Sequence, residues 1–187
     1  MSRTIRFPPC SIVCHDLCEV KIAEHLRSKL RIGIRSFSKN GGKNSLEVQN
    51  IPIQLAGIPG MKDASSFCRI YGLSKNENAP FLSQHRIFFL MDRDAADRKT
   101  WSAYKEGSLF HNLWVAPYAV PIFFEPDLDT LSSLAGYPID KKSHKPDQIQ
   151  KFLSHPNKNY LGDIASLSSH TNLSLLLDYL RSQGFSI

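Results

Sequence analysis

The residues His85-Arg-Ile-Phe-Phe-Leu-Met-Asp-Arg-Asp94 give the clearest structural signal in this sequence. The centre of this stretch, residues 87–91, is an unbroken apolar run. Such a run is typical of a strand that is buried on both faces of a parallel sheet. Two aspartates, Asp92 and Asp94, follow the run with one residue between them. We therefore predict a buried strand whose carboxyl end carries an acidic pair.

Other elements alternate along the chain around this stretch. Residues 10–14 and 31–37 are predicted as the first two strands, and Leu113-Trp-Val-Ala-Pro117 as the fourth. Alternation of strands and helices implies βαβ units, and therefore an α/β, Rossmann-like fold with a mainly parallel four-stranded sheet flanked by helices. The apolar spacing predicts helices at residues 18–30, 46–56, 61–72, 95–109, 127–135, 146–154 and 171–183. Asp16 is the expected N-cap of the first helix, and residues 38–45 and 75–80 are expected to form a loop and a surface turn.

The length of 187 residues fits one domain. We expect an N-terminal tail at residues 1–9, an α/β core at residues 10–135 and a helical C-terminal extension of the same domain at residues 136–187. No apolar stretch is long enough to span a membrane, and the N-terminus lacks the apolar segment of a signal peptide. These features favour a cytoplasmic protein without a membrane partner.

The composition is basic, with 23 Lys and Arg against 17 Asp and Glu, a formal net charge of +6. A basic surface favours a polyanionic partner such as nucleic acid, although many basic proteins bind none. The cysteines Cys10, Cys14, Cys18 and Cys68 lack the paired C-x2-C spacing of zinc sites. We expect Cys10 and Cys14 to pack as small apolar residues, and we expect no structural disulfide.

Acidic residues follow two of the predicted strands. Asp16 and Glu19 follow the first, and Asp92 and Asp94 follow the third. Sites in open α/β sheets form at the carboxyl ends of strands, and hard cations such as Mg²⁺ take carboxylate ligands. We therefore expect Asp92, Asp94 and Glu19 to bind Mg²⁺ or Mn²⁺, with His15 or Asp16 assisting as a ligand or proton carrier.

Each acid also has a purely structural interpretation. Asp94 or Asp97 would cap the following helix while Asp92 pairs with Arg93 or Arg98. Glu19 would favour the dipole of the first helix.

The pattern Val13-Cys-His-Asp-Leu-Cys-Glu19, followed by Phe89-Leu-Met-Asp-Arg-Asp94, resembles the two motifs of Toprim-domain proteins. More narrowly, it resembles small RloB-like and OLD-nuclease-like Toprim proteins, over roughly residues 10 to 135. Their first motif is Glu-Gly-x-x-Glu after an apolar strand, and their second is an apolar strand that ends in Asp-x-Asp. Here His15 stands where the first Glu is expected and Asp16 where the Gly is expected, so that only Glu19 keeps its acid.

The resemblance implies a Toprim-like fold and a metal-dependent nuclease that cleaves phosphodiester bonds in DNA or RNA. It also implies a role in bacterial antiphage defence with an ATPase partner or as a homo-oligomer. Glu19 and Asp16 would be catalytic. Because the first acid is replaced, a catalytically weakened module that binds nucleic acid or protein is the alternative.

A few further residues complete the sequence-based expectations. Pro121-Ile-Phe-Phe-Glu125 resembles a third stretch of the RloB-like proteins, but we favour Glu125 as the cap of the helix near Asp127. Asp-x-Asp after the first strand would suggest haloacid-dehalogenase-like phosphatases, but here it follows the third. The loop at residues 41–45 is no Walker motif, and no Ser or Cys triad is evident. Basic residues expected to contact a nucleic-acid backbone are Lys39, Lys43, Lys141, Lys142 and Lys145.

Overall fold

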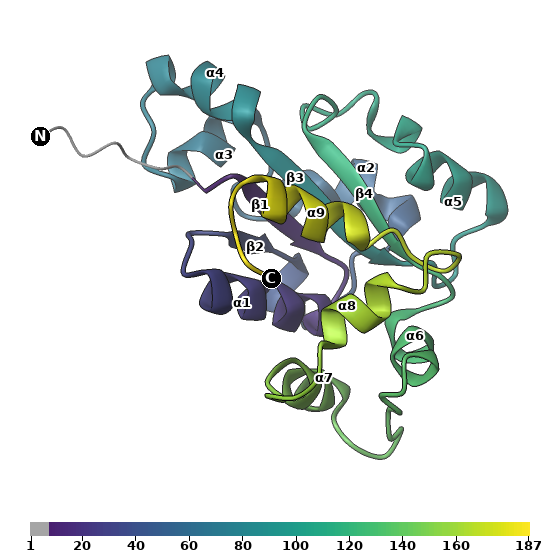
Figure 1. Ribbon diagram of the computed structural model, residues 1–187. Coiled ribbons are helices and arrows are strands. Elements are labelled where there is room, and N and C mark those ends of the chain that lie inside the picture. Colours follow the sequence, from purple (N-terminus) through teal and green to yellow (C-terminus); the bar gives the residue numbers. More distant parts are fainter. Residues whose placement is uncertain (1–7) are drawn as a thin grey trace, which may run out of the picture.

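A central sheet organises the computed structural model, which describes residues 8–187 (Figure 1). The four strands run parallel in the order β2-β1-β3-β4. This confirms the α/β class and the parallel four-stranded sheet flanked by helices. The strands are β1 (Cys10–Cys14), β2 (Arg35–Phe37), β3 (Arg86–Asp92) and β4 (Ala119–Phe124). Residues 1–7 of the predicted N-terminal tail lie outside the described part of the chain.

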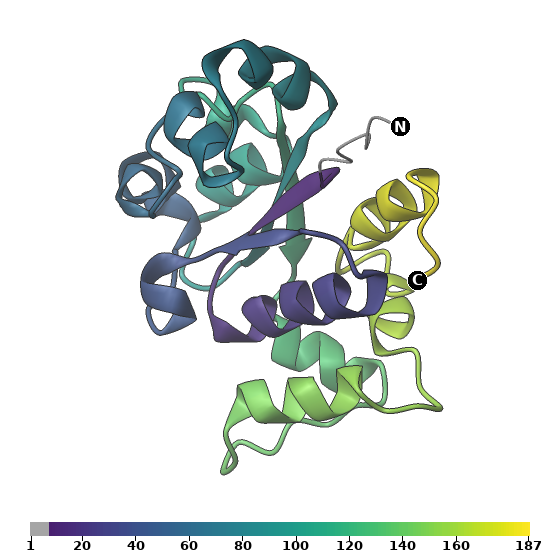
Figure 2. The ribbon, with the colours of Figure 1, turned by 90° about the vertical axis from the view of Figure 1, so that its left-hand side faces the viewer.

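Helices cover both faces of the sheet (Figure 2). One face carries the helices from the middle of the chain, and the other carries α1 together with the C-terminal helices. The first set comprises α2 (Ile51–Gln54), α3 (Ala64–Ile70), α4 (Lys75–Gln84) and α5 (Arg98–Lys105). The second comprises α1 (Leu17–Leu30), α6 (Leu128–Leu134), α7 (Lys145–Leu153), α8 (Tyr160–Ala165) and α9 (Ser174–Ser182). Short 3₁₀ segments are η1 (Lys39–Gly42), η2 (Val48–Asn50), η3 (Leu55–Gly57) and η4 (Ser108–Phe110).

Strand β3 is the most buried element of the sheet. Its residues 87–91 are at most 1% exposed, as the apolar run predicts. Side chains alternate between the two faces, so Phe88 and Leu90 enter one core while Ile87, Phe89 and Met91 enter the other. Two separate hydrophobic cores therefore clamp β3 and fix where its carboxyl end lies.

The prediction of the fourth strand was wrong. Leu113–Pro117 forms turns, and β4 is the stretch at residues 119–124 that contains Pro121. Proline is accepted here because β4 lies at the edge of the sheet, where a missing N–H costs no ladder bond. The Asn172 side chain takes the place of a neighbouring strand: its amide donates to the Pro121 carbonyl at 2.9 Å and accepts from the Phe123 N–H at 2.9 Å.

Other elements differ from the sequence predictions in extent. Residues 75–80 belong to helix α4, not to a turn. Ser74 and Glu77 form a capping box at its start, and the buried side chains of Phe81 and Leu82 pack the helix against the core. Residues 31–34 are not part of β2, since Arg31 has φ 53° and ends helix α1. The helix predicted at residues 46–56 is broken into η2, α2 and η3, and helix α8 was not predicted.

Candidate metal centre

The candidate site lies at the carboxyl ends of β1 and β3, which are neighbours in the sheet. Cys14, the last residue of β1, is aligned with Leu90 of β3. The next residue, His15, continues this pairing through an N–H bond to the Leu90 carbonyl at 2.9 Å. Asp92 ends β3 one residue beyond the apolar run. The parallel sheet thus brings His15 close to Asp92 and Asp94, as the strand-end argument predicts.

His15 is fixed on both of its ring nitrogens. Nδ1 lies 3.0 Å from the Leu46 carbonyl oxygen, and Nε2 lies 2.7 Å from Asp94 Oδ2. The side chain is only 4% exposed. The backbone is fixed as well, because the Leu46 N–H donates to the His15 carbonyl at 2.8 Å. The imidazole therefore has one orientation, with Nε2 facing the acidic pair.

Asp92 is buried among other carboxylates. Its Oδ1 accepts the Leu128 N–H at 3.1 Å, near the start of α6. Burial raises the pKa of Asp92 well above its ordinary value, and Asp94, Asp16 and Asp127 raise it further, whereas the bond from Leu128 lowers it. A proton or a cation is needed to relieve this concentration of negative charge.

Asp94 completes the group from a turn in which its φ is 43°, a left-handed conformation that non-glycine residues seldom adopt. Its side chain is 43% exposed. His15, Asp92 and Asp94 each offer one ligand atom, and these atoms lie within 4.8 Å of one another, close enough to hold one metal ion. The expected acidic pair is therefore joined by His15.

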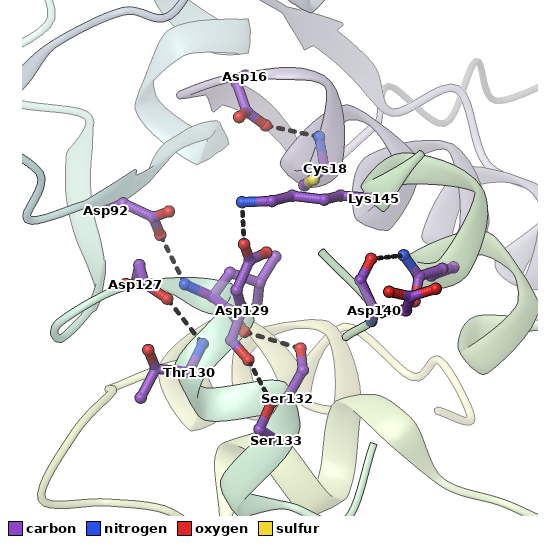
Figure 3. Close-up of polar contacts among 12 residues, drawn as sticks. Asp16, Cys18, Asp92, Asp127, Asp129, Thr130, Ser132, Ser133, Asp140 and Lys145 are labelled. Carbon is purple, nitrogen blue, oxygen red and sulfur yellow. Dashed lines mark hydrogen bonds and ion pairs between the residues drawn. The ribbon is translucent and has the colours of Figure 1, made fainter. Parts of the chain in front are cut away.

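These residues line a cavity of about 220 Å³. Lys145 reaches this cavity from α7 and forms an ion pair with Asp129 of α6 (Figure 3). Figure 3 shows the Lys145 side chain extending into the space that Asp16, Asp92 and Asp129 surround. The cavity thus combines several carboxylates with one cation. The residues that line it are His15, Asp16, Cys18, Ser45, Asp92, Asp94, Asp127, Leu128, Asp129 and Lys145.

Asp16 and Glu19 form the capping box of α1. Asp16 Oδ1 accepts the Cys18 N–H at 2.6 Å, and Glu19 Oε2 accepts the Asp16 N–H at 3.0 Å. Asp16 is thus the predicted N-cap and also lines the cavity. Glu19 is fully buried and does not line it. Burial raises the pKa of Glu19 well above its ordinary value, and Asp92 and Asp16 raise it further.

One oxygen of Glu19, Oε1, is buried and has no hydrogen-bond partner among the described residues. A buried acceptor of this kind costs free energy unless the carboxyl group is protonated or a cation lies near it. Glu19 therefore adds to the need for a proton or a cation beside Asp92.

The other predicted residues lie apart from this cavity. Asp97 caps α5 by accepting the N–H groups of Lys99 and Thr100. The expectation that Glu125 caps a helix was wrong, because Asp127 caps α6 and Glu125 pairs with Arg93 and Lys105. Four of the lysines expected at nucleic acid do not line the cavity: Lys39, Lys43, Lys141 and Lys142.

The acidic residues that follow β4 were missed. Asp127 and Asp129 border the cavity from the start of α6. The sequence carries a hint, since Asp127-Leu-Asp129 repeats the Asp-x-Asp spacing after a strand. The wrong position of the fourth strand concealed it. Cys18 also lines the cavity, and all four cysteines are free and buried.

In comparisons with protein families, curated proteins and solved structures, none matched this chain. Within residues 8–187, no helix is both long and apolar enough to cross a membrane. The chemistry of the site therefore has to be inferred from its residues.

Proposed function

We propose that this protein is a metal-dependent nuclease that hydrolyses phosphodiester bonds in DNA or RNA. The observation that carries the proposal is the grouping of His15, Asp92 and Asp94 in a polar cavity at the ends of two parallel strands. These residues would hold Mg²⁺ or Mn²⁺, which when bound polarises a phosphoryl oxygen and makes a bound water more acidic. The resemblance to RloB-like and OLD-nuclease-like Toprim proteins supports the same chemistry.

The cavity offers roles for two further side chains. Asp16 lines the cavity, so it would accept the proton of the attacking water. Glu19 does not line the cavity, and it would act by holding the Asp16 main chain in place. Lys145 would leave Asp129 and pair with the substrate phosphate, to which a lysine binds as a point charge.

The substrate and partners can be proposed from the charge and the resemblance. The net charge of +6 supports a nucleic-acid substrate. An ATPase partner, a homo-oligomer, a part in antiphage defence and a cytoplasmic location follow from the Toprim resemblance and the sequence arguments. Lys39, Lys43, Lys141 and Lys142 would contact the nucleic-acid backbone outside the cavity.

One observation favours the alternative of a binding module without catalysis. Asp16 and Glu19 already serve as the capping box of α1, and Lys145 is neutralised by Asp129. These acids therefore have a structural role that would persist in a catalytically weakened protein. The module would bind nucleic acid or protein through the same lysines.

A cleavage assay separates the two functions. The full chain is incubated with end-labelled DNA and RNA in Mg²⁺, in Mn²⁺ and in EDTA, beside Asp92→Asn and Asp94→Asn. Asp178→Asn is the matched control, because Asp178 is exposed on α9 and pairs with Arg181. We expect cleavage that EDTA and both site variants abolish and that the control retains. Cleavage that survives in EDTA would refute the metal-nuclease proposal, and binding without cleavage in every metal would favour the module.

A further inference from the structure

The ring of His15 stands where the Toprim resemblance expects a glutamate, and its hydrogen-bond partners define its tautomer. The Leu46 carbonyl can only accept a hydrogen bond, so Nδ1, 3.0 Å away, carries a hydrogen. In the neutral ring the lone pair therefore lies on Nε2. Histidines that ligate metals are oriented in this way, because the second nitrogen donates to a carbonyl or carboxylate.

Nε2 faces the two carboxylates. Asp94 Oδ2 is 2.7 Å from Nε2, and the ligand atoms of Asp92 and Asp94 lie within 4.8 Å of it. The 2.7 Å separation is the distance of a hydrogen bond from a protonated nitrogen, and a metal ion bound by both atoms would replace that proton. The ring cannot turn away, because it is almost completely buried and its backbone is bonded to Leu90 and Leu46 on either side.

Glu19 is a second feature that a bound cation would stabilise, as would protonation of its carboxyl group. Glu19 is fully buried with an unpartnered oxygen, and its charge and that of Asp92 act on each other. No lysine or arginine is paired with Asp92 or Glu19 among residues 8–187. Lys145, the lysine that lines the cavity, is paired with Asp129.

We propose that this centre selects a first-row transition-metal ion over Mg²⁺, and that His15 Nε2 is the selecting ligand. The inference rests on the proposed function, because it concerns the same centre, but it assigns the metal that the cavity prefers. Mg²⁺ favours oxygen ligands and retains its waters, whereas an imidazole ligand suits transition metals. The affinity should therefore rise in the order Mg²⁺, Mn²⁺, Co²⁺, with Co²⁺ above Mn²⁺ as the general stability order requires.

The test uses the full chain stripped of metal by chelation. Calorimetric titration gives the affinities for Mg²⁺, Mn²⁺ and Co²⁺ in the native protein and in His15→Asp, which restores an all-oxygen site. His111→Asp makes the same change in charge at an exposed histidine after η4, outside the cavity, and is the matched control. We expect Mn²⁺ to bind at least about tenfold tighter than Mg²⁺, and His15→Asp to reduce that preference by about tenfold or more.

A spectroscopic measurement keeps the test valid if His15→Asp fails to fold. Electron spin-echo spectra of Mn²⁺ bound to the native protein should show coupling to a directly bound ¹⁴N nucleus. Labelling with [¹⁵N]histidine should replace that coupling with the ¹⁵N pattern. Spectra without nitrogen coupling would overturn the proposal.

The failures of this inference and of the proposed function are distinguishable. Equal affinity for Mg²⁺ and Mn²⁺ together with metal-dependent cleavage would overturn the selection by His15 and leave the nuclease standing. The absence of any divalent-ion binding would overturn both. A preference for Mn²⁺ that persists unchanged in folded His15→Asp would also overturn the assignment of His15.

Discussion

His85 offers a quantitative test of how the sheet is held together at the end opposite the cavity. It precedes β3 and packs against the rings of Phe67, Tyr71 and Phe81. Its Nδ1 lies 3.0 Å from the Pro8 carbonyl, and its Nε2 lies 2.8 Å from the Ser11 hydroxyl. Burial lowers the pKa of His85 from 6.5 to about 4, so the folded protein holds this ring neutral.

The magnitude follows from that pKa. Between pH 6.5 and about 4, His85 is protonated in the unfolded chain and neutral in the folded one. The unfolded state then binds more protons, so the free energy of unfolding falls as the pH falls through this window. At about 1.4 kcal/mol per pH unit, the loss attributable to His85 approaches about 3 kcal/mol near pH 4. Above pH 7 the His85 ring is neutral in both states, so it does not lower the free energy of unfolding.

The assay is urea denaturation of the native protein and of His85→Gln at intervals between pH 7.5 and 4. Gln cannot titrate but can still bond to Ser11. Asp92 and Glu19, whose pKa values are raised, change the free energy of unfolding in the opposite direction, and subtraction of the two curves removes them. The difference between the two proteins should shrink by about 3 kcal/mol as the pH falls. Parallel curves would refute the assignment of a neutral buried His85.

Three further predictions follow from the same structure. Asp92→Asn should raise the melting temperature of the metal-free protein at pH 8, because the raised pKa of Asp92 means that its negative charge disfavours folding at this pH. The same variant should abolish the stabilisation of about 2.7 kcal/mol that Mn²⁺ gives at 100 times its Kd. An unchanged response to Mn²⁺ in a calorimetric scan would contradict this. Tyr104→Phe should lower the free energy of unfolding by about 1–2 kcal/mol in urea titrations. The buried hydroxyl donates to the Phe89 and Ile122 carbonyls of β3 and β4 at 2.6 and 2.9 Å. An unchanged free energy of unfolding would show that these hydrogen bonds do not stabilise the protein. Cys10, Cys14 and Cys68 should react with a thiol reagent in denaturant but only slowly in the native protein, because they are buried and burial raises their pKa values, that of Cys10 to about 12. Rapid reaction of these three in the native protein would indicate an open core.

Local sequence determined much of the sheet. The apolar run at residues 87–91 identified β3 because burial on both faces leaves no polar position in the strand. The N-cap at Asp16 was equally evident, since its bond to a nearby N–H is local. Strand β4 was misplaced, and the Asn172 side chain that covers its edge lies about fifty residues further along the chain, where local sequence gives no sign of the contact.

The candidate site was only partly predictable for the same reason. Asp92 and Asp94 follow a recognisable strand, so their position at its carboxyl end could be inferred. The orientation of His15 depends on the Leu46 carbonyl, and Lys145 reaches Asp129 across the cavity from α7. Such contacts join segments far apart in the chain and have no local pattern. Glu19 was expected among the ligands, although its position three residues after the N-cap Asp16 is the spacing of the capping box that the structure shows.

His15, Asp92 and Asp94 are expected to bind one divalent metal ion together. Anomalous X-ray scattering from crystals of the full chain grown with Mn²⁺ would locate that ion. We predict an anomalous peak for one Mn²⁺ ion at bonding distance from His15 Nε2 and from the carboxylates of Asp92 and Asp94. A map with no peak in this cavity, and with His15 still hydrogen-bonded to Asp94, would contradict this expectation.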